Sequence, residues 1–599
     1  MQQPQRLFDF VDYQVAQRPA GVMLASKING AWQTISCKEV MQRARDLASG
    51  LLSLGIANGE LVPERQEKIA IVSQNRPEWV IIDLAVQQTG GILVPIYPTV
   101  SPQDFAFILN EAEVKIIFFS NRELYERFQP AFAGIPSLKH VYTFDEVPGV
   151  EHWSRLKPTA EGEQQREAVC GRITTETIAT IIYTSGTTGA PKGVMLCHRN
   201  IVSNVTDSAP LFHFARKDDR ALSFLPLNHI FEKMITYVYI RGGLGIYYAE
   251  SMDTIGDNLK EVKPMVFTCV PRLLEKVYEK IMAKGHELKG IKKAMFFWAV
   301  DLGKRYDNIK RGSLWYRIQL SLANKLIFSK WREALGGRVD AVVSGSAALS
   351  EKLIRIFSAA KITVMEGYGL TETSPVISVN HLESENRRIG TVGPALKNVE
   401  VKLAEDGEIL CRGNNVMVGY YKNPEATARE IDAEGWFHTG DIGIWVEDRF
   451  LKITDRKKEI FKTSGGKYVA PQAIENKMRE SPYIEQMMVV GPGRKFVSAL
   501  IVPNYAQVRN KLKNEGKSLP ADNEALIKEE SVIRLIQQQV DRYNPEFGHV
   551  EQVKKFVLLP SEWTVDNGIL TPKLSIRRKV VDEKYKSEID AMYEGNGED

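Results

Sequence analysis

An alternation of strand and helix patterns near the N-terminus constrains the fold of this chain more than any other feature. Residues 68–72 (KIAIV) predict a buried strand, and the next helix begins at Pro77 and ends before Gly90. Apolar runs at 92–97 and 114–119 predict two further strands. Strands that alternate with helices form a parallel sheet covered by helices on both faces. Such sheets bind ligands beyond the carboxyl ends of their strands, so we expect functional residues on the loops that follow strands.

The composition is that of a large globular protein. The 599 residues are 44% hydrophobic and 25% charged, which excludes a disordered chain or a fibrous repeat. The 78 basic and 74 acidic residues leave a net charge of +4, so the chain is not a uniformly basic nucleic-acid binder, and we expect no nucleic-acid partner. Five cysteines are scattered without a CxxC pair, which argues against a disulfide scaffold or a cysteine zinc site and favours a reducing compartment.

The expected location is the cytoplasm. The first ten residues, MQQPQRLFDF, contain no apolar segment of a secretory signal. The most apolar stretch, residues 80–100, is interrupted by Asp83, Gln87 and a pair of glycines, so it does not predict a membrane span.

Residues 272–335 differ from the rest of the chain in charge. They contain 15 basic and 6 acidic residues, many aromatic residues and no proline, and they are predicted to be helical. Two interpretations stay open. The aromatic side chains face the core and the lysines face water, or the segment is a basic, aromatic surface that rests on anionic lipid at the inner face of a membrane.

The C-terminal part of the chain predicts a second domain. A dense charge run at 455–460 (DRKKEI) is followed by a Gly-Gly pair, and apolar runs at 487–490 and 496–502 flank a Gly-Pro-Gly turn that predicts a hairpin. We expect a large domain over residues 1–455, with 272–335 as a helical insertion, and a small α+β domain over residues 456–599.

Residues 183–193 (YTSGTTGAPKG) form the strongest chemical motif, and they follow a strand-like run at 178–182. Glycines allow backbone N–H groups to approach phosphate oxygens, hydroxyls add hydrogen-bond donors, and Lys192 neutralises charge. The motif is not a Walker A loop, because Lys192 is followed by Gly193 rather than by Ser or Thr. The pattern extends over eleven consecutive residues, which is longer than a generic Ser/Gly turn and argues against that interpretation.

Four blocks in this order resemble the adenylate-forming superfamily of acyl-CoA synthetases, peptide-synthetase adenylation domains and luciferases. Residues 183–193 resemble its phosphate loop, and residues 367–373 (GYGLTET) its adenine and magnesium block. Residues 435–441 (GWFHTGD) resemble the ribose block, and residues 455–471 (DRKKEIFKTSGGKYVAP) the interdomain hinge block. Together the four blocks extend the resemblance over essentially the whole chain.

The resemblance implies the fold and the reaction. The expected fold is α/β, with a large N-terminal AMP-binding and acyl-binding domain of mixed, largely parallel sheets covered by helices, and a small mobile α+β C-terminal lid domain. The expected reaction transfers a carboxylate onto the α-phosphate of ATP with release of pyrophosphate, and then onto the thiol of CoA. The implied cofactor is Mg²⁺, with ATP and CoA as co-substrates. Such catalysis holds two anions in line while cations absorb the developing charge.

The resemblance also assigns the residues that handle this charge. Thr184 and Glu372 are expected to hold magnesium, which suits a partial oxygen shell completed by phosphates. Thr371 is expected to reach the α-phosphate, and Arg456 the ribose or a phosphate. The expected catalytic residues are Lys192, Thr371, Glu372, Arg456 and Lys573.

The nucleotide is expected to lie among residues of several blocks. By resemblance, Tyr368 stacks on adenine, Gly345 and Ser346 line the adenine and carboxylate side, and Asp441 accepts hydrogen bonds from both ribose hydroxyls. The full expected ATP- and AMP-binding set is Thr184, Ser185, Gly186, Thr187, Thr188, Gly189, Lys192, Gly345, Ser346, Tyr368, Gly369, Thr371, Asp441 and Arg456.

The second half-reaction is expected to need a movement of the small domain. In the family this domain is thought to rotate about a residue two places after the arginine of the hinge block, which is Lys458 here. The rotation would bring Gly465 and Gly466 beside a narrow pantetheine tunnel for CoA, because glycine permits close approach of backbone to a ligand.

One block departs from the family pattern. The lysine that grips the carboxylate during adenylation should lie within residues 570–579 (LTPKLSIRRK), and the best register places Ser575 there. Lys573, two residues earlier, is expected to take the role; otherwise adenylation proceeds without it. Lys579 belongs to a basic run, 577–579, that is expected to be a solvated charge cluster.

The acyl group is expected to lie near residues 226–231 (PLNHIF), which resemble the block that lines the acyl pocket and place His229 there. The amino-acid sequence of the hinge block and the presence of the 272–335 insertion resemble those of long-chain fatty acyl-CoA synthetases. The expected function is therefore a long-chain fatty acid–CoA ligase that converts fatty acid, ATP and CoA into acyl-CoA, AMP and pyrophosphate.

Two alternatives stay open. One is a fatty acyl-AMP ligase that loads a carrier protein, and the other is a catalytically weakened fatty-acid-binding or uptake partner at the membrane. The intact phosphate, magnesium and ribose blocks argue against the second alternative, because a pure binder has no use for Glu372. The oligomeric state stays open, a homodimer included.

Overall fold

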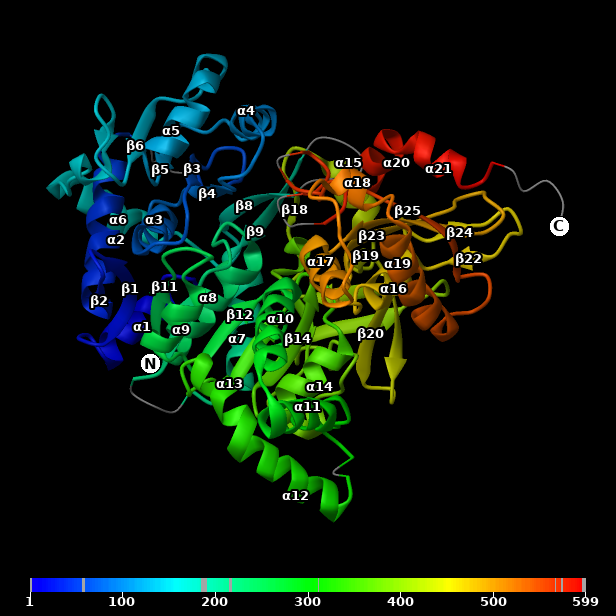
Figure 1. Cartoon of the computed structure of the whole chain (residues 1–599). Helices are drawn as coiled ribbons and strands as arrows, with labels where there is room; N and C mark the ends of the chain where they lie inside the picture. Colours follow the sequence, from blue (N-terminus) through cyan, green and yellow to red (C-terminus); the bar gives the residue numbers. More distant parts are fainter. Residues whose placement is uncertain are drawn as a thin grey trace. The chain divides into compact units, whose positions relative to one another are not determined.

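The computed structural model describes residues 3–55, 60–184, 191–214, 218–310, 312–565, 567–571 and 575–594 (Figure 1). The chain divides into two compact units. The first unit comprises Met1–Lys402, Leu410–His438 and Trp445–Leu451, and the second comprises Leu403–Ile409, Thr439–Ile444 and Lys452–Asp599. The second unit thus takes two short earlier segments in addition to the C-terminal part, whereas the sequence predicted one boundary after residue 455.

An eight-stranded sheet in the first unit contains the predicted strand–helix alternation. Its strand order is β18-β9-β8-β4-β3-β5-β6-β7, and it is parallel from β8 to β7, while β9 and β18 run antiparallel to their neighbours. The strands are β3 (Lys68–Val72), β4 (Ile92–Ile96), β5 (Ile116–Phe119), β6 (His140–Thr143), β7 (Glu151–His152), β8 (Ile178–Thr184), β9 (Lys192–Cys197) and β18 (Gly419–Tyr420).

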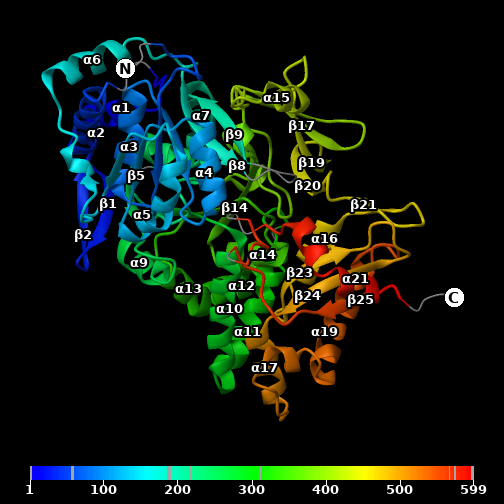
Figure 2. The same ribbon diagram turned by 90° about the horizontal axis from the view of Figure 1, so that it is seen from above.

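Helices cover both faces of this sheet, as predicted (Figure 2). Along β3, Ile69 and Ile71 pack into the cluster that contains α3 (Pro77–Gln88), whereas Ala70 and Val72 pack into the cluster that contains α4 (Pro102–Glu111). This alternation follows from the two-residue period of a strand. Ser101 caps α4 by accepting a hydrogen bond from the Asp104 backbone N–H at 3.0 Å.

The third predicted strand begins two residues later than expected. Glu113 adopts a positive φ of 54°, and the Val114 backbone N–H donates to the Leu109 carbonyl at 3.0 Å, so these residues end the preceding helix. The strand β5 therefore begins at Ile116.

A second eight-stranded sheet in the same unit has the order β15-β14-β13-β12-β10-β11-β1-β2. It is parallel from β14 to β1, with antiparallel strands β15 and β2 at its edges. The strands are β1 (Val22–Ile28), β2 (Ala31–Ser36), β10 (Arg220–Ser223), β11 (Gly245–Tyr248), β12 (Val266–Cys269), β13 (Ala341–Ser344), β14 (Thr363–Gly369) and β15 (Val376–Val379).

A buried polar contact joins the helices between these two sheets. Lys233 of α8 (Ile230–Gly242) forms an ion pair with Asp83 of α3, and both side chains are fully buried. The Tyr237 hydroxyl donates to the other oxygen of Asp83 at 2.7 Å. Burial of two charges is tolerated only when each is paired, so this contact fixes α8 against α3.

The remaining helices of the first unit surround the two sheets. They are α1 (Asp9–Gln17), α2 (Cys37–Leu52), α5 (Arg122–Phe128), α6 (Ala160–Cys170), α7 (His198–Ser208), α9 (Ile255–Val262), α10 (Pro271–Glu287), α11 (Gly290–Lys304), α12 (Leu314–Ala323), α13 (Ser329–Ala334), α14 (Glu351–Ala359) and α15 (Pro424–Glu430). No helix among the residues described is long and apolar enough to cross a membrane.

The basic segment 272–335 is helical, as predicted, and forms most of α10 to α13. Phe296, Phe328 and Trp331 are buried in the core, in agreement with the first interpretation of this segment. Trp315 differs, because 67% of its surface is exposed.

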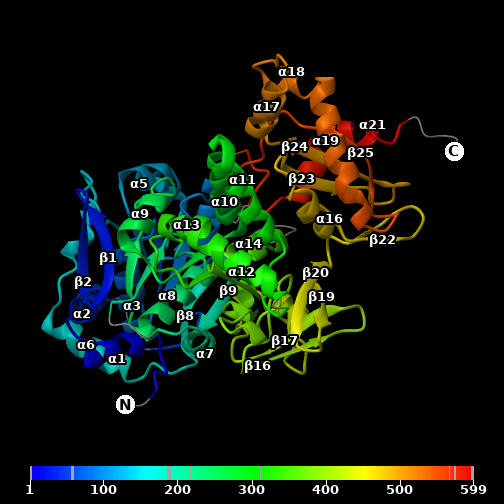
Figure 3. The ribbon, with the colours of Figure 1, turned by 60° about the horizontal axis from the view of Figure 1, so that its bottom comes forward.

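A four-stranded sheet has the order β16-β17-β19-β20 (Figure 3). Its strands are β16 (Val399–Leu403), β17 (Glu408–Gly413), β19 (Phe437–Val446) and β20 (Phe450–Arg456). The residues of each of these four strands are divided between the two compact units.

The second unit is the predicted small α+β domain. Its three-stranded sheet has the order β23-β24-β25, and the predicted hairpin is formed by β23 and β24. Its elements are β21 (Phe461–Lys462), β22 (Tyr468–Val469), β23 (Ile484–Val490), β24 (Val497–Pro503), β25 (Val553–Leu558), α16 (Pro471–Met478), α17 (Tyr505–Asn514), α18 (Asn523–Leu526), α19 (Glu530–Tyr543), α20 (Arg578–Lys584) and α21 (Lys586–Ala591). The predicted α/β class, with two large, mostly parallel sheets and a small C-terminal unit, is confirmed.

Candidate active site

Glu372 lies in a short 3₁₀ turn, Thr371–Thr373, that follows β14. Its carboxylate accepts a hydrogen bond from the Tyr420 hydroxyl at 3.0 Å, and its carbonyl accepts one from the Met417 backbone N–H at 2.8 Å. Burial, and then the neighbouring Glu372 carboxylate, raise the pKa of Tyr420, so this hydroxyl stays protonated and donates. The turn after β14 is therefore bound to the segment that contains β18.

Lys192 and Thr184 lie at the same edge of the first sheet. Thr184 is the last residue of β8 and Lys192 the first of β9, and the two are directly opposite each other in the ladder. The Lys192 ammonium lies 4.9 Å from the ring centroid of Tyr420, within the range of a cation–π contact. Tyr420 thus connects Lys192 to Glu372, and Thr184 lies beside Lys192 on the neighbouring strand.

The central part of the expected phosphate loop lies outside the described residues. It comprises Ser185, Gly186, Thr187, Thr188 and Gly189. The described residues Thr184 and Lys192 on its two sides place the ends of this loop next to the Glu372 turn.

The turn that contains Glu372 needs a glycine before it. A Cβ atom on Gly369 would lie 1.7 Å from the Pro375 carbonyl oxygen, so no other residue fits there without moving the backbone. Tyr368 immediately precedes it and is half-buried, and Thr371 is buried. The expected adenine and α-phosphate residues therefore lie on one short, sterically constrained segment.

A buried carboxyl connects this segment to the loop after β13. Glu366 accepts a hydrogen bond from the Leu349 backbone N–H at 3.1 Å, and burial raises the pKa of Glu366 to about 8. The loop includes Gly345 and Ser346, and Ser346 adopts a positive φ of 69°. Glu366 thus holds the expected adenine loop beside the strand that leads to Tyr368.

His229 lies at the beginning of α8. Its Nδ1 accepts a hydrogen bond from the Phe231 backbone N–H at 3.1 Å, which caps the helix. A Cβ atom on Gly345 would lie 3.3 Å from the Phe231 ring. The block that resembles the acyl-pocket lining therefore meets the Gly345 loop beyond the carboxyl ends of the parallel strands β10 and β13, as the parallel-sheet rule predicts.

A second buried carboxyl lies one turn into α8. Glu232 accepts hydrogen bonds from the hydroxyls of Ser223 at 2.6 Å and Thr268 at 2.5 Å, at the carboxyl ends of β10 and β12. Burial raises the pKa of Glu232 to about 7, and the two hydrogen bonds oppose that shift. The sequence patterns did not indicate this group.

In the second unit, the expected ribose and phosphate residues are ion-paired. The Arg456 Nε donates to an Asp441 carboxylate oxygen at 3.0 Å, and the Asp441 backbone N–H donates to the Thr439 hydroxyl at 3.1 Å. The Asp441 side chain is mostly buried, whereas that of Arg456 is 42% exposed. The two residues are thus held together in adjacent strands, β19 and β20.

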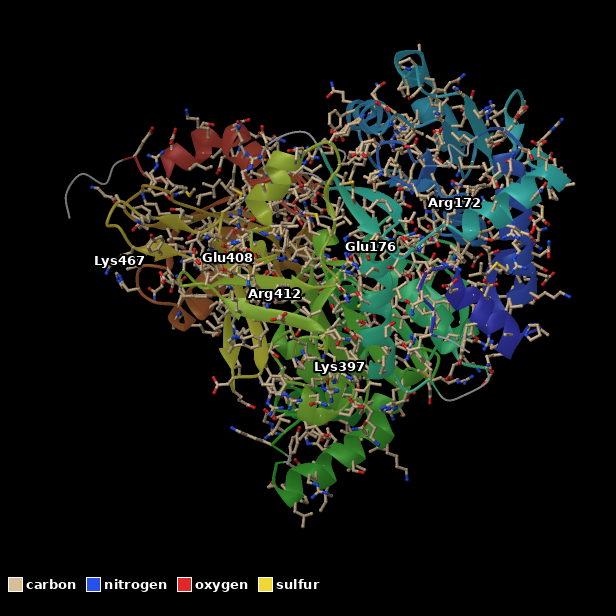
Figure 4. The ribbon with its side chains drawn as sticks, turned by 180° about the vertical axis from the view of Figure 1, so that it is seen from behind. Arg172, Glu176, Lys397, Glu408, Arg412 and Lys467 are labelled. Carbon is tan, nitrogen blue, oxygen red and sulfur yellow. The ribbon has the colours of Figure 1, made fainter. Side chains whose placement is uncertain are left out.

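The expected hinge lies in the turn after β20. Lys457 donates to Glu408, labelled in Figure 4, at 2.7 Å, and its ammonium also lies 2.6 Å from Asp406. Lys458 follows as an exposed residue of the turn, with a negative φ. A residue anchored by two carboxylates therefore precedes the exposed Lys458.

Gly465 and Gly466 form the tip of the β21–β22 hairpin. Gly466 adopts a positive φ of 74°, and its backbone N–H donates to the Thr463 carbonyl at 2.9 Å. No described atom lies within 4 Å of the position that a Cβ on Gly466 would take. Within its unit this backbone is open to a ligand.

Lys573 lies outside the described residues. Leu570 and Ile576 form an antiparallel bridge on either side of it, and the Thr571 backbone N–H donates to the Ser575 carbonyl at 2.8 Å. The bridge defines the ends of the segment that contains Lys573.

The prediction of a solvated charge cluster at 577–579 is wrong for Arg578. Its guanidinium donates to Glu459 at 2.8 Å and to both oxygens of Glu475 at 2.7 and 2.6 Å, and Glu475 is buried. Lys579 is 84% exposed, as predicted. The physical reason is that α20 begins at Arg578, which turns this side chain inward and its neighbour outward.

The donor set suits magnesium better than a metal held by the protein alone. Among the described residues no group of three or more His, Cys, Asp or Glu side chains could hold a metal ion. A hydroxyl from Thr184 and a carboxylate from Glu372 are oxygen ligands of the kind that Mg²⁺ takes when substrate phosphates and water complete its shell.

Sequence reasoning missed Tyr420 and the Arg578 anchor. Tyr420 reaches Glu372 only because β18 pairs with β9 more than two hundred residues away in sequence. A tyrosine after Gly419 in a short apolar stretch carries no signal of that strand pairing.

Two family descriptions match the chain. "AMP-binding enzyme" matches residues 11–421, and "AMP-binding enzyme C-terminal domain" matches residues 458–597. A long-chain-fatty-acid–CoA ligase of Mycobacterium bovis is 34% identical over 583 residues, which cover 96% of this chain and 95% of the relative. A human long-chain-fatty-acid–CoA ligase is 31% identical over 607 residues, which cover 94% of this chain and 82% of the relative.

Solved structures share the fold. The adenylation domain of a carboxylate reductase from Mycobacterium chelonae superposes with a TM-score of 0.75 at 21% identity, covering 99% of this chain and 92% of that one. O-succinylbenzoate coenzyme A synthetase from Bacillus subtilis, in complex with ATP and magnesium, superposes with a TM-score of 0.65 at 17% identity, covering 95% of this chain and 98% of that one.

Proposed function

Because this chain belongs to the AMP-binding enzyme family, we propose that it is an ATP-dependent, AMP-forming long-chain fatty acid–CoA ligase. In the first step a carboxylate oxygen of the fatty acid attacks the α-phosphorus of ATP, and the bond to pyrophosphate breaks. In the second step the CoA sulfur attacks the acyl carbon, and AMP leaves with the carboxylate oxygen. The identity of this chain to ligases named for long-chain fatty acids, over nearly the full length of both, supports the substrate class.

One observation carries the proposal: Tyr420 contacts both Lys192 and Glu372, and Thr184 lies opposite Lys192 in the strand ladder. A hydroxyl, an ammonium and a carboxylate at the ends of a Gly-rich loop suit a triphosphate with its metal. Mg²⁺, when bound by Thr184 and Glu372, supplies positive charge that neutralises the phosphates. Lys192 and Thr371 are proposed to hold the phosphate oxygens.

The remaining contacts of the nucleotide are proposed from the same blocks. Tyr368 and the Gly345–Ser346 loop are proposed to hold adenine, and Asp441 to accept from the ribose hydroxyls. Arg456 is proposed to orient the Asp441 carboxylate or to contact a phosphate, and its ion pair with Asp441 supports the first role. Lys573 is proposed to stabilise the charge that develops on the attacked phosphate.

The thioester step is proposed to use the small domain, residues 456–599, as a lid that turns about Lys458. The open backbone at Gly465 and Gly466 would then lie along the pantetheine arm of CoA. The acid is proposed to lie near His229, whose helix begins next to Gly345.

A cytoplasmic location with peripheral contact at the inner face of the membrane is also proposed. The excess of basic residues in 272–335 supports it, because anionic lipid attracts such a segment. Fractionation of cells that make the protein tests this location: release of membrane-bound protein by salt supports it, and protein that never sediments with membranes contradicts it.

An exchange of labelled pyrophosphate into ATP, measured with fatty acids of increasing chain length and with or without CoA, tests the activity. Exchange without CoA and acyl-CoA formation with it, both greatest for long chains, are expected. The Glu372→Ala variant is expected to lose at least about 100-fold of the exchange rate, as removal of one group that stabilises a charged transition state does. An unchanged exchange rate of that variant at saturating magnesium would show that Glu372 does not hold magnesium in this reaction.

A further inference from the structure

Helix α12 carries a stripe of exposed apolar side chains. Trp315 is 67% exposed and Ile318 is 52% exposed. The spacing of these residues places them on one side of the helix and of the π-helical segment, Asn324–Phe328, that continues it. The members of this α12 surface are Leu314, Trp315, Ile318, Leu322 and Leu326.

The opposite side of the same helix is packed into the first unit. The Tyr316 hydroxyl donates to the Leu302 carbonyl of α11 at 3.0 Å, and the Asn324 amide donates to the Ala359 carbonyl of α14 at 2.8 Å. Ala323 and Phe328 are buried. Figure 1 shows α12 at the lower end of the first unit, where it extends past α11 and α14. The helix is therefore held in place on one side and leaves its apolar stripe uncovered.

The segment that carries the stripe is basic. Between Asp307 and Glu333 the chain contains six Lys or Arg residues and no Asp or Glu. Arg317, Lys325 and Lys330 are exposed. A surface that combines apolar and basic side chains matches an anionic lipid interface. The apolar side chains contact the acyl chains, and the basic side chains contact the anionic headgroups.

The same charges disfavour a second copy of the chain as the occupant. A symmetric dimer through this stripe would place each patch against itself and bring the basic side chains of both copies together. Like charges brought together across an interface repel each other and disfavour association. Lipid satisfies both the apolar and the charged part of the surface, and a second copy satisfies only the apolar part.

We propose that the α12 surface is the part of this protein that inserts into the interface of an anionic membrane. The helix lies in the plane of the membrane, because its ten residues extend only about 15 Å and cannot span it. This inference rests on the proposed peripheral contact and assigns it to particular residues.

Co-sedimentation with vesicles tests the assignment. The full-length protein is mixed with vesicles of phosphatidylglycerol and phosphatidylcholine, or of phosphatidylcholine alone. The test variant is Ile318→Glu, and the matched control is Ile28→Glu, which makes the same change at a residue of similar exposure, 54%, on strand β1. Circular dichroism and thermal unfolding confirm that both variants are folded.

The wild-type protein is expected to bind the anionic vesicles and to be released as salt rises, because contacts with headgroups are screened within about 8 Å at physiological ionic strength. Ile318→Glu is expected to weaken this binding about tenfold or more, since it loses apolar burial and adds repulsion from anionic lipid. Ile28→Glu is expected to bind as the wild type does. Both variants are expected to exchange pyrophosphate into ATP at the wild-type rate with a fatty acid in solution.

Three results would overturn the proposal. Equal binding of Ile318→Glu and wild type would show that the α12 surface does not make the membrane contact, although the protein still binds the membrane. Failure of the wild type to bind anionic vesicles would contradict both the peripheral membrane contact and its assignment to the α12 surface. A concentration-dependent dimer in solution that Ile318→Glu dissociates would show that a second copy covers the stripe. The pyrophosphate exchange of the same preparations reports separately on the ligase activity.

Discussion

At the scale of single residues, Tyr420 is the side chain that holds the candidate site together. Its hydroxyl donates to Glu372 and its ring faces the ammonium of Lys192. If Glu372 holds magnesium as proposed, a residue that orients this carboxylate changes metal affinity without touching the reacting atoms. Tyr420 is therefore a positioning residue in the proposed reaction.

We predict that Tyr420→Phe raises the KM for magnesium–ATP about 10- to 100-fold, the range for loss of a group that orients a metal ligand, with a smaller loss of kcat. The phenylalanine ring keeps the contact with Lys192 and loses only the hydrogen bond to Glu372. Steady-state kinetics over a range of magnesium concentrations, with direct titration of magnesium–ATP binding, measure the effect.

Tyr421→Phe is the matched control for that variant. The Tyr421 hydroxyl is buried and has no hydrogen-bond partner among the described residues. Its removal is expected to leave the KM for magnesium–ATP unchanged. Equal kinetics of the two variants and wild type would mean that the Tyr420 hydroxyl does not orient Glu372.

At the scale of elements, a buried ion-paired arginine anchors the chain shortly after Lys573. Arg578, at the start of α20, is bound to Glu475 of α16 and to Glu459 in the turn after β20. Burial alone would lower the pKa of Arg578, but the two carboxylates together outweigh it and raise this pKa above its usual value. The anchor thus connects three elements of the second unit to the end of the segment that contains Lys573.

Arg578→Met is predicted to destabilise the second unit by about 3–5 kcal/mol, because it leaves the buried Glu475 without its partner. Lys579→Ala is expected to change the free energy of unfolding by less than about 0.5 kcal/mol, as surface substitutions usually do. Denaturant titration followed by circular dichroism measures both. Similar small effects of the two substitutions would contradict the buried anchor.

The turn after β20 should act as the hinge. Lys458→Pro is predicted to spare pyrophosphate exchange and to block thioester formation, because proline fixes φ near −65° and Lys458 already has a negative φ in this conformation. Exchange and acyl-CoA formation measured on the same preparation separate the two steps. A parallel loss of both would show that the residue is structural.

Local patterns were sufficient to predict the elements but not the contacts between them. The strands β3, β4 and β8 and the helices α3 and α4 follow from apolar periodicity, proline and a capping serine, all of which act within a few residues. The four blocks placed Thr184, Lys192 and Glu372 in one site through their resemblance to a family. Tyr420, Glu232 and Arg578 gain their partners only from strand pairing and packing, which have no signature at that distance along the chain.

At the scale of the whole molecule, buried carboxyls couple the stability of the first unit to pH. Glu232, fully buried between α8, β10 and β12, has its pKa raised from 4.5 to about 7 by burial, while the hydroxyls of Ser223 and Thr268 favour its ionised form. Burial, and then the Glu232 carboxylate, raise the pKa of the buried Tyr239 and Tyr248 hydroxyls. Because the folded state holds this proton more tightly, stability is complete below pH 4.5 and falls as pH rises toward 7.

Glu232→Gln is predicted to remove this dependence. Relative to wild type, the variant should gain about 3 kcal/mol in free energy of unfolding between pH 4.5 and pH 8, since each unit of pKa shift corresponds to about 1.4 kcal/mol. Urea titrations at several pH values measure the difference. A difference between variant and wild type that stays constant with pH would show that Glu232 does not titrate in this range.

The central claim is that a fatty carboxylate is activated as an adenylate before CoA takes it. The most direct test is to supply a long-chain fatty acid labelled with ¹⁸O in both carboxylate oxygens, together with magnesium–ATP and CoA, and to analyse the products by mass spectrometry. We expect acyl-CoA and AMP in equal amounts, with one ¹⁸O in the phosphate of AMP and none in pyrophosphate. ADP and labelled free phosphate, or AMP without label, would contradict it.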